Sequence, residues 1–155
     1  MEETTGIARR VFDAYNAHDP SALGALYDPA ARTHRPGWPE EGGVEELLAA
    51  ARMDAVAFPD LRLEPLLWAR EGTRTLTEVR ITGTNTGEIV LGDFGRATAE
   101  TTAEAVGATG KPIDITGVIV HEVDEDEGLV VAERQYWGLL ELLAQLGLFS
   151  TVPKG

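Results

Sequence analysis

Cysteine is absent from the 155-residue sequence, and basic residues are scarce. Without cysteine, the chain has no disulfide, no thiolate metal site and no cysteine nucleophile. Thirteen Lys and Arg stand against 26 Asp and Glu, so the formal net charge is −13. Such an acidic chain is poorly suited to neutralise phosphates or anionic lipid headgroups. Neither nucleic acid nor a membrane surface is therefore an expected partner.

Long apolar runs are missing as well. The most apolar stretch, GLLELLAQLGLFS, is shorter than the roughly 18 residues that cross a bilayer, and it contains Glu141 and Gln145. The start, MEETTGIARR, lacks the charged-then-apolar pattern of a signal peptide. These absences predict a soluble, cytoplasmic protein.

The residues that are present suit a single folded domain. The composition is 43% hydrophobic and 25% charged, which supplies a core without the signature of disorder. The length is close to the most common size of one domain, so we expect one domain over residues 1–155.

Helical periodicity is confined to the N-terminal third of the chain. Ile7, Val11, Phe12 and Tyr15 recur at helical spacing before a stop at residues 18–20. Ser21 or Asp19 can cap a second, short helix that contains Leu23, Leu26 and Tyr27. The Pro- and Gly-rich stretch ARTHRPGWPEEGG predicts irregular chain, and a third helix follows from Val44 to about Phe58.

Two-residue alternation replaces this pattern after Pro59. It predicts four strands, over residues 61–69, 73–85, 112–123 and 128–137. The acidic run 124–128 predicts a hairpin turn, and the small, polar stretch 92–110 predicts a loop, with a short helix at 98–106 left open. Three helices before a run of strands indicate an α+β domain, with helices on one face of a curved antiparallel sheet.

The order of these elements, together with several phrases, resembles the SnoaL-like polyketide cyclases, which have the nuclear-transport-factor-type α+β cone. The phrases are ARRVFDAYNAHDPSALGALYDPAA, FPDLRLE, TGTNTGE, TGKPIDITGVIVHEV and LLELLAQLG. The resemblance implies a cone-shaped barrel of sheet and helices around a deep, mainly apolar pocket. It also implies subunits that associate through their sheets as a homodimer or larger assembly. The implied activity is a cofactor-free aldol closure, with an aspartate as general acid/base and a histidine beside it.

Carrying these roles over places the family's histidine on His121 and its catalytic aspartate on Gln135. Glutamine cannot exchange a proton near neutral pH, so another group must replace the aspartate. By strand alternation Glu133, Gln135 and Trp137 share one face, on the strand expected to pair with that of His121. Burial in an apolar pocket would raise the pKa of Glu133, which makes it the predicted substitute acid/base.

Further residues are candidates for binding the substrate. His34 and Trp38 belong to a segment that could line the pocket mouth, and the rings of Phe58 and Trp137 could stack on a ligand. Asn85 stands in TGTNTG, where a histidine is frequent in the resembled family. The three histidines are scattered with no close pair, so no metal site is expected.

These observations predict a cofactor-free cyclase or isomerase acting on a hydrophobic, polyketide-like small molecule by enolate or aldol-type chemistry. His121 and Glu133 would transfer protons, and Gln135 would donate a hydrogen bond to the developing enolate. Two alternatives stay open. One is a non-catalytic module that binds a small molecule, and the other is epoxide opening, which in this fold uses an Asp-Arg-Asp arrangement not found on one face of this sequence.

Overall fold

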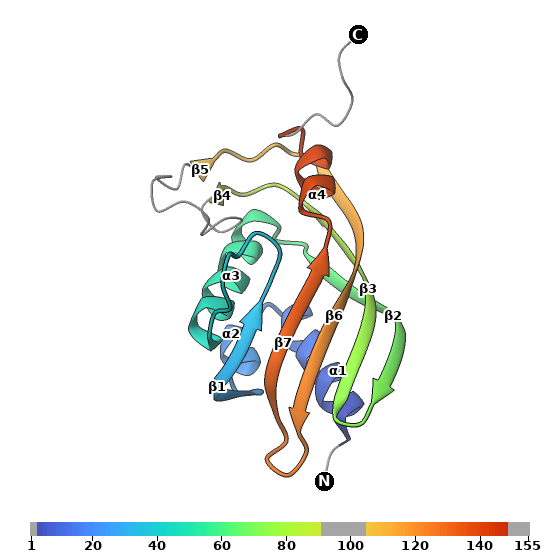
Figure 1. Ribbon diagram of the computed structural model, residues 1–155. Helices are drawn as coiled ribbons and strands as arrows, with labels where there is room; N and C mark the ends of the chain where they lie inside the picture. The colour runs from blue at the N-terminus through green and yellow to red at the C-terminus, as the bar shows by residue number, and fades with distance from the viewer. Residues whose placement is uncertain (1–2, 91–104, 149–155) are drawn as a thin grey trace.

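The computed structural model describes residues 3–90 and 105–148 (Figure 1). In chain order the elements are α1 (Thr4–Asn16), α2 (Pro20–Gly24), β1 (Tyr27–His34), α3 (Val44–Ala57), β2 (Arg62–Glu71), β3 (Arg74–Thr84), β4 (Ile89–Val90), β5 (Ala105–Val106), β6 (Pro112–Asp124), β7 (Leu129–Trp137) and α4 (Leu139–Gln145). No helix among these residues is both long and apolar enough to cross a membrane.

A curved five-stranded sheet forms the framework of the molecule (Figure 1). Its strand order is β1-β7-β6-β3-β2, and β4 and β5 make a separate two-stranded sheet. The four predicted strands are confirmed, and the contacts β2–β3, β3–β6 and β6–β7 are antiparallel as expected. The cone-like α+β architecture is therefore confirmed, as an open sheet rather than a closed barrel.

The helices bury one face of this sheet. In α1 the apolar residues Ile7, Val11 and Phe12 are buried, and the helix contacts β2, β3, β6 and β7. Asp19 caps α2, where its carboxylate accepts a hydrogen bond from the backbone N–H of Ala22 at 3.0 Å. Glu46 secures the start of α3 by accepting from the backbone N–H of Gly43 at 3.1 Å.

Side-chain alternation decides what the helices cover. Along β3 the residues Thr75, Thr77, Val79 and Ile81 are buried, while their neighbours Arg74, Leu76, Glu78 and Arg80 are exposed. Val79 and Ile81 join buried residues of β6 and the ring of Phe12 in one core cluster. A second cluster lies between α1, α2, α3 and β1. Both clusters belong to the same side of the sheet, so its other face is left to solvent or to a partner.

Strand β1 is the main departure from the sequence prediction. Tyr27 was expected to continue a helix and residues 31–43 to be irregular, but Tyr27–His34 pairs in parallel with β7. The strand lies at the edge of the sheet, where Pro29 is tolerated. An irregular register between Tyr27 and Arg32 interrupts the two-residue alternation from which the other strands were predicted. Tertiary pairing thus overrides weak local preference, and it makes the sheet mixed rather than wholly antiparallel.

Other connections agree with the prediction in part. The acidic turn is confirmed as a hairpin: Asp124 accepts from the backbone N–H groups of Asp126 and Glu127, and Gly128 has a φ of +68°. Residues Ala105–Val106 are a strand, not the end of a helix. The rest of the predicted loop, residues 92–104, lies outside the described residues.

Candidate active site

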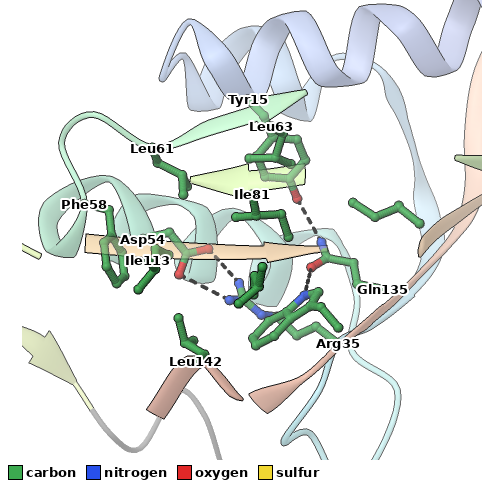
Figure 2. A pocket seen from close by; sticks show the side chains of 13 residues that line it. Tyr15, Arg35, Asp54, Phe58, Leu61, Leu63, Ile81, Ile113, Gln135 and Leu142 are labelled. Atoms are coloured by element: carbon green, nitrogen blue, oxygen red, sulfur yellow. Dashed lines mark hydrogen bonds and ion pairs between the residues drawn. The ribbon is translucent and has the colours of Figure 1, made fainter. Parts of the chain in front are cut away.

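A pocket opens between the inner face of the sheet and helices α1, α3 and α4 (Figure 2). Its empty volume, which includes space open to solvent, is about 540 Å³. Most of the lining is apolar: Phe58, Leu61, Leu63, Ile81, Ile113, Ile115, Ile119 and Leu142. Five residues add polar or aromatic groups: Tyr15, Arg35, Asp54, Gln135 and Trp137.

Gln135 is the polar centre of one wall. Its side-chain oxygen accepts a hydrogen bond from Nε1 of Trp137 at 3.1 Å, which fixes the orientation of the amide. Its nitrogen then donates to Glu133 at 3.0 Å and to the Tyr15 hydroxyl at 3.4 Å. The position that the resemblance implied for a catalytic aspartate therefore does line the pocket, and it holds a hydrogen-bond donor.

Glu133 lies directly behind Gln135. Oε1 of its carboxylate accepts from the Tyr27 hydroxyl at 2.6 Å and faces Nε2 of His121 at 2.7 Å. The latter contact follows from the sheet register, which places His121 opposite Glu133 across β6 and β7. His121 and Glu133 are 0% and 1% exposed, and neither lines the pocket. The two residues are in contact, as the pairing of their strands led us to expect, but they lie beneath the pocket wall and not in the cavity where the sequence placed them.

The electrostatics of Glu133 correct the expectation from sequence. Burial alone would raise its pKa, but the hydrogen bond and charge of His121, with the bonds from Tyr27 and Gln135, hold the pKa below its ordinary value. Burial, followed by the charge of Glu133, raises the pKa of both Tyr15 and Tyr27. The glutamate is therefore an ionised acceptor and the two tyrosines are neutral donors.

The tautomer of His121 follows from its surroundings. Nδ1 has no hydrogen-bond partner among the described residues, and the ring packs edge-on against Phe12. The ionised carboxylate of Glu133 can only accept a hydrogen bond, so the ring nitrogen that faces it must carry a proton. We therefore assign the proton to Nε2, from which it is donated to Glu133.

An ion pair on the other side of the pocket was not predicted from sequence. Arg35 follows β1, and its guanidinium binds Asp54 of α3 through two contacts of 3.0 and 3.2 Å (Figure 2). The guanidinium also stacks over the ring of Trp137, 5.5 Å from its centroid. Asp54 lies on the apolar stripe of α3, seven residues after Leu47. A carboxylate among the apolar positions of a helix is the sequence feature that could have indicated a buried ion pair.

The remaining predicted residues divide into two groups. Phe58 and Trp137 line the pocket, whereas His34, Trp38 and Asn85 do not. The His34 ring contacts the backbone oxygen of Trp38 at 3.0 Å, so these two residues fix the turn after β1. Asn85 is fully buried, where its amide donates to the backbone oxygens of Ala57 and Gly87 and accepts from Thr109. These contacts give Asn85 a structural role between the end of α3 and the chain before β6.

The described part of the chain contains no cluster of side chains suited to bind a metal ion. No group of three His, Asp or Glu residues there is placed to hold an ion. The side chains that line the pocket offer one carboxylate, one guanidinium, one phenol, one amide and one indole N–H, which together can hold a polar ligand group or move a proton.

The family model of the SnoaL-like domain matches residues 8–133. The chain belongs to the SnoaL-like family. This match covers most of the sheet, the Arg35–Asp54 side of the pocket and the His121–Glu133 pair, and it ends just before Gln135. None of the curated proteins is significantly similar to the chain.

Solved structures agree with this SnoaL-like fold. AclR from Streptomyces galilaeus, named as a candidate hydroxylase, is 22% identical with a TM-score of 0.74; the match covers 97% of this chain and 85% of AclR. IdmH from Streptomyces antibioticus, named as a candidate polyketide cyclase, is 21% identical with a TM-score of 0.72, over 94% and 99% of the two chains. A candidate SnoaL-like polyketide cyclase from Jannaschia sp. CCS1 is 19% identical with a TM-score of 0.75, over 95% and 93%. At these identities the likeness establishes the fold.

Proposed function

We propose that this protein is a cofactor-free cyclase or isomerase that acts on a hydrophobic, polyketide-like small molecule by enolate or aldol-type chemistry. The observation that carries the proposal is the pocket itself, an apolar cavity with a few convergent polar groups on its walls. Membership of the SnoaL-like family and the naming of solved relatives as candidate polyketide cyclases support the same class of substrate.

The proposed site for the substrate oxygen lies at Tyr15 and Gln135. The contacts of Tyr15 with Gln135 and with Glu133 are both 3.4 Å long, so they are weak bonds that a ligand oxygen can replace. The Tyr15 hydroxyl and one Gln135 N–H would then donate to a carbonyl oxygen as it becomes an enolate. Donors of this kind stabilise the charge that develops in the transition state.

Glu133 and His121 act as positioning residues in this proposal. Glu133 accepts from Gln135 and holds its amide toward the pocket, and His121 and Tyr27 satisfy the other carboxylate oxygen. Because its pKa is lowered and its oxygens are occupied, Glu133 suits this role better than the acid/base role that the sequence predicted. Epoxide opening is less well supported, since the pocket lining contains one carboxylate and the Asp-Arg-Asp arrangement requires two.

The proposal can be tested with β-tetralone, a neutral bicyclic ketone with acidic α-hydrogens. Proton NMR in heavy water would follow the exchange of these hydrogens for deuterium, and calorimetry would measure binding. We expect the wild-type protein to accelerate exchange, and Gln135→Leu to lower the rate by about 10² to 10³ at saturating ketone because one oxyanion donor is lost. Gln145→Leu makes the same change outside the pocket, where the amide binds the backbone of Asp114, so this variant measures the effect of losing an amide that only supports the fold. Binding without exchange would instead indicate the non-catalytic binding module.

We also propose that the protein assembles as a homodimer through the outer face of the sheet. An outer apolar patch, consisting of Leu67, Leu76, Val118, Val120 and Tyr136, lies on the face opposite the buried alternation. Leu67, Leu76 and Tyr136 are 60%, 40% and 53% exposed, and the register places Leu76 beside Val120 and Val118 beside Tyr136. Charges of both signs flank the patch, so a second copy of the same face could meet it with opposite charges paired.

A further inference from the structure

Asp54 is the carboxylate that faces the pocket. Among the lining residues that the structure describes, it is the sole Asp or Glu, because Glu133 is covered by Gln135. Its side chain is 24% exposed, compared with 6% for its partner Arg35. Asp54 thus has access to a bound molecule, whereas the guanidinium that holds it is almost enclosed.

The geometry of the ion pair leaves Asp54 able to accept a proton. Each carboxylate oxygen receives one contact from Arg35, at 3.0 and 3.2 Å, and keeps a second lone-pair direction. Stacking on Trp137 restrains the guanidinium, so the carboxylate is held at a fixed position by a rigid partner. A carboxylate oriented in this way loses little entropy when a substrate arrives.

Asp54 and the hydrogen-bond donors lie on different sides of the pocket. In Figure 2 Asp54 lies toward Phe58 and Ile113, while the Gln135 amide and the Tyr15 hydroxyl are on the other side. A molecule between them would have a base near its carbon skeleton and two donors near its carbonyl oxygen. Deprotonation next to a carbonyl requires a base and oxyanion donors that reach the substrate from different directions.

We propose that Asp54 is the general base of the reaction, in the place of the aspartate that Gln135 replaces. The inference rests on the proposed function and deepens it. An oxygen of Asp54 takes a proton from the carbon next to the substrate carbonyl, and the C–H electron pair becomes the enolate, whose oxygen accepts from Tyr15 and Gln135. The enolate carbon forms a bond to a second carbonyl carbon of the same molecule. The π pair of that carbonyl moves to its oxygen, which receives the proton back from Asp54, so substrate and product are isomers.

The test uses the full-length protein and β-tetralone, with exchange measured at saturating ketone and binding measured by calorimetry. Asp54→Asn should bind β-tetralone nearly as well as the wild type but lower the exchange rate by about 10² to 10⁴. Glu45→Gln is the matched control: it removes a carboxylate from the exposed side of the same helix and should leave exchange unchanged.

Asp54→Glu keeps a negative charge beside Arg35 but displaces the carboxylate. Because a misplacement of about 1 Å can cost roughly 10²-fold in rate, we expect this variant also to slow exchange. This variant decides the question if Asp54→Asn melts below the assay temperature. Wild-type exchange rates in Asp54→Asn, or in Asp54→Glu where Asp54→Asn does not fold, would overturn the assignment of the base alone. Absence of exchange by the wild-type protein would overturn the proposed function, and the assignment of Asp54 with it.

Discussion

Glu133→Gln should destabilise the fold strongly, because the buried carboxylate satisfies donors that an amide cannot. Oε1 of Glu133 faces Tyr27 and His121, and Oε2 faces Gln135. A glutamine in its place keeps one acceptor oxygen and turns two N–H groups toward donors. If Gln135 rotates its amide to relieve the conflict, it loses the bond from Trp137. One buried donor is therefore left unsatisfied in either orientation.

The expected loss can be worked from these contacts. An unsatisfied buried donor costs about 1–3 kcal/mol, and each bond that loses its charged acceptor weakens by about 1 kcal/mol. The total, about 3–5 kcal/mol, agrees with the cost of removing one partner of a buried ion pair. At about 2–4 °C per kcal/mol for a chain of this size, the melting temperature should fall by about 6–20 °C.

Chemical and thermal denaturation at pH 7 would measure this loss, with Glu122→Gln as the matched control. Glu122 lies opposite Ala132 in the sheet, faces outward, and pairs with Arg74 and Arg134 at a solvent-accessible site. Removing such a pair costs about 0–1 kcal/mol. If Glu133→Gln proves as stable as Glu122→Gln, the buried network does not hold the site together and the reasoning is wrong.

The difference in stability between the wild type and Glu133→Gln should depend on pH. The folded-state pKa of Glu133 is lowered below its unfolded value of about 4.3, so the group contributes stability above that pH and loses it as the pH falls through the folded pKa. Glu133→Gln lacks this group. The difference in unfolding free energy between wild type and variant should therefore shrink as the pH is lowered below about 4.3. A difference that stays constant down to the acid transition would contradict the lowered pKa.

Two further predictions concern other parts of the molecule. Asn85→Leu should cost about 2–5 kcal/mol, because the backbone N–H of Thr109 and the oxygen of Ala57 lose buried partners; a change below 1 kcal/mol in urea denaturation would contradict this. Light scattering should show a dimer for the wild type and a monomer for Leu76→Lys, with Val56→Lys, an exposed apolar position on α3, as a control that remains dimeric. A wild-type monomer at micromolar concentration would rule out assembly through the outer apolar patch.

Strong local patterns explain what the sequence could predict. The alternation in β3 and β6 is nearly unbroken, so the strands, their inward faces and the meeting of His121 with Glu133 could all be inferred. Strand β1 could not, because its eight residues, YDPAARTH, have little β-propensity and are ordered by pairing with β7. The Arg35–Asp54 pair depends on that strand, since β1 carries Arg35 to the side of α3, and it was missed for the same reason.

The pKa of Glu133 shows a different limit of sequence reasoning. Alternation places the residue on the inner face and predicts burial, which by itself raises the pKa of a carboxyl group. The direction reverses because three donors converge on it from β1, β6 and β7, and that convergence is a property of the tertiary structure. A buried carboxylate can therefore be predicted from sequence more readily than its protonation state.

The presence of glutamine at position 135 follows from the charge behind it. The Gln135 nitrogen lies 3.0 Å from Oε2 of Glu133, so a carboxylate at this position would place two negative charges in hydrogen-bond contact inside the core. Like charges at that distance cannot both ionise, and one group would have to hold a proton. With Glu133 ionised and fixed by His121 and Tyr27, position 135 requires a donor, and an amide supplies it. A base for enolate chemistry must then come from elsewhere in the lining. Asp54 meets that need, because its negative charge is balanced by Arg35 and it lies across the pocket from the Tyr15 and Gln135 donors rather than beside Glu133.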